Sequence, residues 1–298
     1  MRLINSFNDT APIVVTRPDP PQTPFVLSVP HSGTFYTKDF VASAKLSRRG
    51  LRRSEDTHVD SLFAPALAHG AAMVRAQFPR VLLDANRSAD ELDPAMFDGP
   101  LNLPVDDSSA RVAGGLGVIA KVVGEGQAIY RGPLPPSEAH WRLTTLYHPY
   151  HDALRALLDG AVDRFGYAVL IDCHSMPSNA VRNTAERSSA RPSIVLGDRF
   201  GTSCAAELTS IATTSLERRG YQVARNKPYA GGFITEHYGS RANVHALQIE
   251  VTRSLYMDEA TYLTDVGFDT LRQDLTGLVA DLIEAFIPPE RALPIAAE

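Results

Sequence analysis

Polar side chains that could bind a metal or move a proton follow several short apolar segments of this 298-residue chain. His31 follows the apolar run 25–29, and Asp172 and His174 stand two apart where the run that starts at Tyr167 ends. Residues two apart in a β-strand share a face, so the carboxylate and the imidazole lie side by side. Asp172 could orient His174 as a metal ligand, or it could be an ordinary hydrogen-bonded aspartate.

The two histidines could form a zinc site together with one acidic residue. Asp56 and Glu55 are the candidates for that residue. Catalytic zinc usually has three protein ligands and keeps one position for water, whose pKa the ion lowers towards neutrality. One Zn²⁺ held by His31, His174 and one of these acids would therefore supply hydrolytic chemistry.

Other histidine sets compete with this one, because the chain has nine histidines. The main rival set is His140, His148 and His151. Pro149 separates the last two and interrupts the helical turn between them. We therefore interpret these three histidines as residues of the core or of its rim.

A carboxylate also lies inside an apolar run near the C-terminal end of the chain. Gln248 and Glu250 share one face of the segment 246–251, whose other residues are mostly apolar. A buried carboxylate is costly unless it has a cation, a hydrogen-bond network or a raised pKa. Glu250 could form a structural ion pair with an arginine such as Arg253, or it could face a cleft as a general base.

A fourth polar group, Asp84, Asn86 and Arg87, follows the apolar residues 81–83. Asp and Asn commonly end strands through local side-chain to backbone hydrogen bonds, and the residues alone favour such a turn. Arg87 could equally present its planar guanidinium to a substrate carboxylate.

Strands and helices must bring these four groups together. Short apolar runs predict buried strands at 25–29, 72–75, 81–84, 167–173, 193–196, 221–224 and 246–251. Periodic apolar residues predict helices at 56–70, 137–166 with a break at Pro149, 203–219 and 259–286. Strands that alternate with helices predict a three-layer α/β/α fold with a mostly parallel sheet, whose ligands bind beyond the carboxyl ends of the strands.

The chain has no internal repeat or linker, so we expect one domain over residues 1–298 with a core at about 25–286. The segment 89–136 is rich in Gly, Pro, Asp and Ser, and we expect it to be a long excursion over one face of that domain. It could serve as a lid or as a partner surface.

Composition excludes several classes of function. The chain has 29 basic and 34 acidic residues, a formal charge of −5, and no cationic block that could follow a phosphate backbone, so we expect no nucleic-acid binding. Cys173 and Cys204 are too few and too far apart for a disulfide framework. No signal peptide or membrane span is visible, so we expect a cytoplasmic protein. Nothing in the sequence indicates an oligomeric state.

Seven motifs, taken in order, resemble those of the N-formylglutamate amidohydrolase (N-formylglutamate deformylase) family. They are SVPHSG (28–33), EDTHVD (55–60), FPRVLLDANR (78–87), HPYH (148–151), DCHSMPS (172–178), GGFITEHYG (231–239) and ALQIEVTRSLYMDE (246–259). The family is similar to the zinc carboxypeptidases and aspartoacylase, which implies a mixed sheet of about eight strands between helices.

The resemblance implies one Zn²⁺ bound by His31, Asp56 and His174. In the wider group the first zinc histidine is followed three positions later by a Glu ligand, but here that position is Thr34. The acidic ligand therefore moves to the second motif, where Asp56 is the expected ligand and Glu55 is the reserve.

The resemblance also implies roles in catalysis. Glu250 matches the general base, and Asn86 and Arg87 match a pair that grips a substrate carboxylate; Arg87 could also stabilise the oxyanion. The implied reaction is the hydrolysis of N-formyl-L-glutamate to formate and L-glutamate, a step of histidine degradation.

Glu236 departs from the family pattern, because deformylases of the family usually have Arg at that position. If that Arg binds the side-chain carboxylate, Glu236 would repel the substrate. Candidates for the second carboxylate contact are Arg182, Arg241 and Arg253. The alternatives are a zinc carboxypeptidase, a deacylase of N-acetyl or N-succinyl amino acids, and a non-catalytic protein that binds an acidic metabolite.

Overall fold

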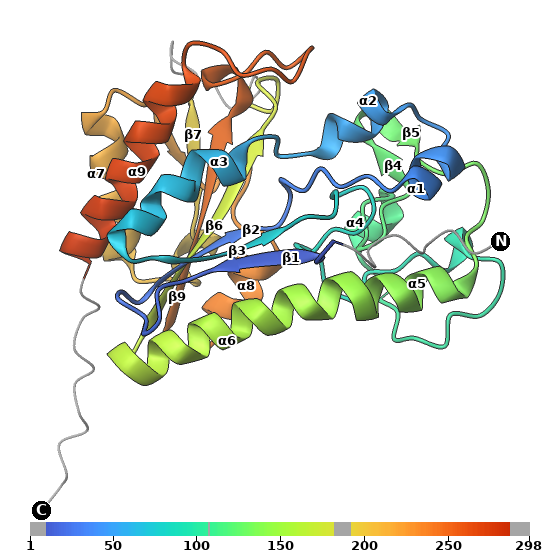
Figure 1. Cartoon of the computed structure of the whole chain (residues 1–298), viewed down its shortest axis with the longest axis horizontal. Coiled ribbons are helices and arrows are strands. Elements are labelled where there is room, and N and C mark those ends of the chain that lie inside the picture. The colour runs from blue at the N-terminus through green and yellow to red at the C-terminus, as the bar shows by residue number, and fades with distance from the viewer. Residues whose placement is uncertain (1–9, 107, 182–191, 287–298) are drawn as a thin grey trace, which may run out of the picture.

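The computed structural model describes residues 10–106, 108–181 and 192–286. Its main feature is a seven-stranded sheet with the order β1-β3-β2-β6-β9-β7-β8 (Figure 1). The strands are β1 Ile13–Thr16, β2 Phe25–Val29, β3 Ala72–Ala76, β6 Ala168–Met176, β7 Ile194–Gly197, β8 Val223–Arg225 and β9 Val244–Thr252. The central strands β3, β2, β6 and β9 are mutually parallel, whereas β1 and β7 pair antiparallel with their neighbours β3 and β9.

Helices cover both faces of the sheet, and alternate residues of each strand feed two separate cores. Leu27 and Ile171 pack into a core that also contains α3, α7 and α9, whereas Val26 and Leu170 pack into a core with α6 and α8 (Figure 1). The helices are α1 Lys38–Ser43, α2 Arg48–Leu51, α3 Val59–Phe63, α4 Ala110–Ala113, α5 Pro136–Arg142, α6 His148–Phe165, α7 Ala206–Arg218, α8 Phe233–Gly239 and α9 Phe268–Ala285. The prediction of a three-layer α/β/α fold with a mixed, mostly parallel sheet is confirmed.

Several predicted elements are wrong in detail. The strand expected at 81–84 is a turn. The backbone N–H groups of Leu82 and Leu83 donate to the carbonyl of Pro79, and the N–H of Asp84 donates to the carbonyl of Val118. The described sheet has seven strands where about eight were expected, and its edge strand β1 lies before the predicted start of the core.

Two helices also differ from expectation. Pro149 does not break its helix: it lies in the first turn of α6, and a π-helical turn at Leu143–Tyr147 joins α5 to α6 so that the lost amide donor is accommodated. The last helix begins at Phe268 and not at 259, because Asp258 accepts backbone hydrogen bonds from Ala260 and Thr261 and so closes a turn there.

The segment 89–136 is an excursion, as expected, and it carries α4 and a small two-stranded sheet, β4 Val122–Val123 with β5 Gln127–Ala128. Figure 1 shows this small sheet beside α1 and α2, away from α7 and α9. Within the described ranges, no helix is both long and apolar enough to cross a bilayer.

Candidate active site

A cavity of about 570 Å³ lies where β2, β6 and β9 end. Its wall contains the four polar groups of the sequence motifs, among them His31, Asp84, His174 and Glu250. Such a position beyond the carboxyl ends of parallel strands is where ligands bind in open α/β sheets. Val122 and other residues of the excursion 89–136 also line the cavity, so this segment forms part of the site wall.

The sheet places the polar side chains on one face. In the parallel pairing of β6 with β9, Asp172 is opposite Gln248 and His174 is opposite Glu250. Side chains of paired residues point to the same face, which here is the α6 and α8 side of the sheet. His31 reaches the same place because β2 pairs with β6 and the chain turns immediately after Val29.

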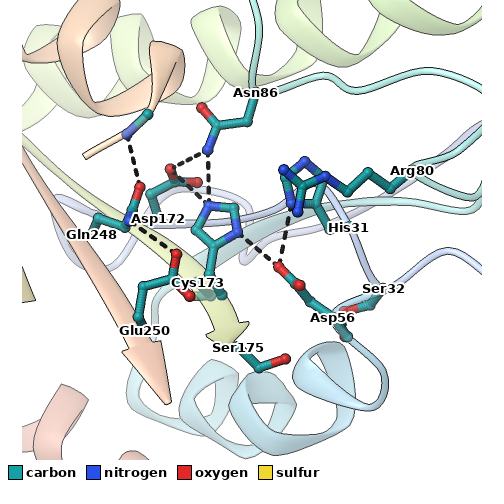
Figure 2. Close-up of polar contacts among 12 residues, drawn as sticks. His31, Ser32, Asp56, Arg80, Asn86, Asp172, Cys173, Ser175, Gln248 and Glu250 are labelled. Carbon is teal, nitrogen blue, oxygen red and sulfur yellow. Dashed lines mark hydrogen bonds and ion pairs between the residues drawn. The ribbon is translucent and has the colours of Figure 1, made fainter. Parts of the chain in front are cut away.

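His31, Asp56 and His174 form a compact cluster whose possible ligand atoms all lie within 4.8 Å of one another. Asp56 Oδ2 is 3.3 Å from His31 Nδ1 and 2.9 Å from His174 Nδ1 (Figure 2). Ligands of a tetrahedral zinc lie about 3.3 Å apart when the bonds are about 2.0 Å long. The three side chains are therefore of the right type and spacing for a zinc ion.

The second nitrogen of each imidazole faces another carboxylate. His31 Nε2 is 2.7 Å from Asp84 Oδ1, and His174 Nε2 is 3.0 Å from Asp172 Oδ2. With a metal bound at Nδ1, these carboxylates would favour the tautomer that has its N–H on Nε2; at His174, the Asn86 amide nitrogen also lies 3.0 Å from Nε2. Metal-bound histidines commonly have such carboxylate partners, which fix the tautomer and make the ligand more basic.

Charge interactions reinforce this cluster. Burial alone would raise the pKa of Asp56, but hydrogen bonds from His174 and His31 hold it well below its usual range. Burial opposes the charged form of His174, yet Asp172 and Asp56 raise the pKa of its imidazole well above the ordinary value. Asp56 is thus anionic at neutral pH.

Glu55 is not available as the acidic ligand. Its carboxylate is fully buried and accepts hydrogen bonds from the Tyr36 hydroxyl at 2.6 Å, Arg52 Nε at 2.9 Å and the Thr57 hydroxyl at 3.1 Å. The neighbouring Asp56 instead faces both histidines with its carboxylate, and its backbone N–H bonds to the His31 carbonyl. Of the two acids, only Asp56 belongs to the cluster.

Two small residues after His31 connect its loop to the rest of the site. The Ser32 hydroxyl donates to the Asp56 carbonyl at 2.9 Å, which ties the first motif to the second. A side chain at Gly33 would meet the Phe78 carbonyl oxygen at 2.1 Å, so only glycine fits here. Thr34 is exposed, which agrees with its exclusion as a ligand.

Glu250 lies beside the cluster and is only 8% exposed. Burial raises the pKa of its carboxyl to about 7, with His174 acting in the opposite direction. Gln248 orients it: the Gln248 amide donates to Glu250 Oε1 at 3.1 Å and accepts from the Gly232 N–H at 2.8 Å (Figure 2). The alternative of an ion pair with Arg253 is wrong, because the Arg253 guanidinium instead faces Asp56 Oδ1 at 3.4 Å.

Asn86 and Arg87 both line the cavity, but their side chains have different hydrogen-bond partners. The Asn86 amide nitrogen lies 3.0 Å from His174 Nε2 and donates to Asp172 Oδ2 at 3.2 Å, and its oxygen accepts from the Ile234 N–H at 2.7 Å, so the amide braces His174 and its carboxylate partner. Arg87 bonds to the carbonyls of Leu116 and Asn86. Burial lowers the pKa of Arg87, so this buried cation would be stabilised by a bound anion.

The motifs did not reveal two further cavity arginines. Arg80 Nε bonds to Asp84 Oδ2 at 2.9 Å and so links a cation to the outer carboxylate of His31. Arg199 also lines the cavity, together with Gly231 and Gly232. Arg80 lies inside the motif FPRVLLDANR, four residues before Asp84, so the sequence could have indicated its place in the site. No sequence motif indicates that Arg199 belongs to the site.

The three arginines that the sequence offered for the second substrate carboxylate lie in different parts of the chain. Arg241 pairs with Asp159 and does not line the cavity, Arg253 lines it but is already bonded to Asp56, and Arg182 lies outside the described residues. Glu236 pairs with Arg199 at 2.5 Å. Of the rival histidines, His140 and His148 are exposed and His151 is buried, and none of the three lines the cavity.

A cavity with a possible metal cluster and an adjacent buried carboxylate, built on an α/β/α fold, is typical of hydrolytic enzymes. The model of one such family, "N-formylglutamate amidohydrolase", matches residues 23–257. The chain therefore belongs to the N-formylglutamate amidohydrolase family, as the motifs indicate.

Known proteins agree with this assignment. The chain is 31% identical over 267 residues to an N-formylglutamate deformylase of Pseudomonas putida, covering 86% of this chain and 92% of that protein. It is 39% identical to a solved N-formylglutamate amidohydrolase from Ralstonia eutropha, with a TM-score of 0.85 and coverage of 92% and 98%. A protein from Agrobacterium tumefaciens at 17% identity and a TM-score of 0.65, covering 92% and 94%, shares the fold.

Proposed function

We propose that the protein hydrolyses N-formyl-L-glutamate to formate and L-glutamate, with one zinc ion bound by His31, Asp56 and His174. The observation that carries the proposal is the buried Glu250, held next to this three-ligand cluster on the wall of an arginine-lined cavity. Membership of the amidohydrolase family supports the reaction class. Histidine degradation and a cytoplasmic location stay predictions from the sequence.

Zinc at this cluster would polarise the formyl oxygen and lower the pKa of water, which is the chemistry that such ions supply in hydrolases. The protein's own residues then handle protons and orientation. Glu250, whose pKa is about 7, accepts a proton from the attacking water and passes it to the leaving amine nitrogen. The water oxygen forms the new bond to the formyl carbon as the C–N bond breaks.

Arg87 binds the substrate carboxylate next to the scissile amide in this proposal. The guanidinium presents a planar fork to a carboxylate, which fixes the orientation of the substrate as well as its position. Asn86 supports this role through its backbone carbonyl oxygen, which accepts from Arg87 Nη1 at 2.8 Å. Asn86 therefore positions Arg87 from the same turn that braces Asp172.

The test measures formate release by zinc-loaded enzyme from N-formyl-L-glutamate and N-formyl-L-leucine, and compares it with cleavage of N-acetyl-L-glutamate and N-succinyl-L-glutamate. We expect N-formyl-L-glutamate to be the best substrate and chelation to abolish turnover. The acetyl and succinyl compounds are followed by release of L-glutamate. Faster cleavage of either one would support the deacylase alternative, and no cleavage of any compound would overturn the enzyme assignment.

Glu250→Gln tests the base. The variant keeps the shape of the side chain, so we expect normal zinc content and a kcat about 10²- to 10⁴-fold lower. Glu138→Gln is the matched control, because Glu138 is also buried but pairs with Arg142 outside the cavity. Near-normal turnover of Glu250→Gln would remove Glu250 from the mechanism, and full zinc occupancy of His174→Ala would exclude the proposed ligands.

A further inference from the structure

We propose that Arg199, held in place by Glu236, binds the side-chain carboxylate of the substrate and selects acidic N-formyl amino acids. This inference rests on the proposed deformylase function. It gives Glu236 a role opposite to the one expected from sequence, because the acid positions a cation and does not face the substrate. The support comes from the backbone around Arg199, from its hydrogen bonds and from the occupation of the other cavity arginines.

The backbone brings Arg199 to the wall that carries the proposed base. Arg199 follows β7, in which Gly197 pairs with Gln248 of β9. A side chain at Gly197 would lie 2.7 Å from backbone atoms of Ala230 and Gly231, so glycine allows the loop before α8 to cross β7 closely. That crossing puts Arg199 and Gly231 together on the cavity wall with Gln248.

Two hydrogen bonds orient the guanidinium of Arg199, but they do not engage all of its N–H donors. Its Nη2 donates to Glu236 Oε1 at 2.5 Å and its Nη1 to the Gly231 carbonyl at 3.4 Å. Among the described residues its Nε has no hydrogen-bond partner, and an arginine has five N–H donors in a fixed fork. The Nε–H, together with the terminal N–H groups that do not face these two partners, therefore remains for a carboxylate.

Glu236 is an anchor outside the cavity and not part of its wall. Its side chain is 54% exposed and does not line the cavity, whereas the Arg199 side chain is 29% exposed and does. An ion pair of this exposure contributes little to folding stability, because solvent screens it and the side chains lose entropy. Loss of Glu236 should therefore affect the position of Arg199 more than the stability of the protein.

Most other cavity arginines are committed elsewhere. Arg80 bonds to Asp84, and Arg253 bonds through all three guanidinium nitrogens to Ser175, to the carbonyls of residues 53 and 55, and to Asp56. Arg111 faces Glu91 Oε1 at 3.5 Å, and Arg87 is assigned to the carboxylate beside the scissile bond. Arg53, which also lines the cavity, is the appropriate comparison in the test.

The test compares N-formyl-L-glutamate with its neutral isostere N-formyl-L-glutamine, using zinc-loaded wild type, Arg199→Met, Arg199→Lys, Glu236→Gln and Arg53→Met. Arg218→Met is the control, since Arg218 is ion-paired with Asp281 and is not a cavity residue. The readout is the ratio of kcat/KM for the two substrates. A second readout is the rise in melting temperature that L-glutamate, but not L-glutamine, produces.

We expect the wild type to prefer the acidic substrate and Arg199→Met to lose about 10- to 100-fold of that preference, mainly through KM. Arg199→Lys should lose less, Glu236→Gln should lose a few-fold in the same direction, and Arg218→Met should keep the wild-type ratio. Stabilisation by L-glutamate should weaken in the same order. If Arg199→Met does not fold, Arg199→Lys and Glu236→Gln decide the outcome.

A wild-type preference for N-formyl-L-glutamate that survives unchanged in Arg199→Met would overturn this inference and leave the proposed function intact. The same holds if the preference is lost in Arg53→Met instead. If the wild type releases no formate from either substrate, the proposed function fails and the inference fails with it.

Discussion

The carboxylate behind the first histidine should tune metal affinity, and Asp84→Asn tests this directly. Asp84 accepts hydrogen bonds from His31 Nε2 at 2.7 Å, Arg80 Nε at 2.9 Å and the Asn86 N–H at 2.9 Å. Burial opposes the charge, but Arg80 and His31 hold the pKa of Asp84 well below its usual range. A full negative charge therefore lies behind the imidazole whose Nδ1 faces Asp56.

The size of the effect follows from how an asparagine would fit. Oδ1 of Asp84 serves two donors, so the amide oxygen should take that position and keep the His31 tautomer. The amide NH₂ would then face Arg80 Nε, which is another donor. The imidazole loses the charge that makes it basic but not its orientation. We expect zinc to bind about 10- to 100-fold more weakly, a change of about 1.4–2.8 kcal/mol.

Zinc affinity is measured by competition with a chromophoric chelator at constant pH, with the fold checked by thermal unfolding. Glu138→Gln is again the control, because Glu138 and Asp84 are both 4% exposed and each pairs with an arginine. A folded Asp84→Asn protein that binds zinc within two-fold of wild type would show that His31 is not a zinc ligand oriented by Asp84.

Two further predictions concern stability. Burial lowers the pKa of His151 to about 4. The unfolded chain, with a pKa near 6.5, binds a proton first, so the free energy of unfolding should fall as the pH drops from about 6.5 towards 4, by about 2 kcal/mol at pH 5. Urea titrations at pH 7 and pH 5 should show a smaller difference for His151→Gln; an equal difference would refute this. Gly33→Ala should lower the melting temperature and weaken zinc binding, because its Cβ would meet the Phe78 carbonyl at 2.1 Å. Gly160→Ala, with open space at a helical site, should instead stabilise by about 0.5–1 kcal/mol; a thermal scan that finds the two variants alike would contradict the steric argument.

The buried parallel strands could be predicted because they are continuous apolar runs. β6 and β9 are buried along nearly their whole length, and their few polar residues therefore stood out as site candidates. β1 has no such signal: it is a four-residue edge strand with half-buried and exposed positions. The apolar run at 81–84 led to a wrong strand prediction. Its residues Leu82 and Leu83 are buried, but they lie in a turn that the excursion 89–136 covers.

Parallel strand order explains why His31 and His174 could be expected to meet, but it does not decide between neighbouring residues of a loop. The choice of Asp56 over Glu55 depends on irregular backbone after α2, including His58 at a φ of 67°. Arg199 could not be found from sequence because its contact with Glu236 crosses 37 residues. Such a contact depends on the close approach of the backbone at Ala230 and Gly231 to Gly197, and no local sequence pattern predicts that approach.

The electrostatic problem of an acidic enzyme with an acidic substrate has a local solution in this structure. The chain carries a formal charge of −5, yet six arginines and only three carboxylates line the cavity. Arg80 and Arg253 are offset by Asp84 and Asp56, and Arg87 also lies 3.9 Å from Asp84. Arg111 and Arg199 pair with Glu91 and Glu236, which do not line the cavity, so the lining itself keeps a surplus of cations. A cleft of one sign concentrates oppositely charged ligands even when the whole molecule repels them weakly. The cavity therefore favours a dianion before any metal charge is counted.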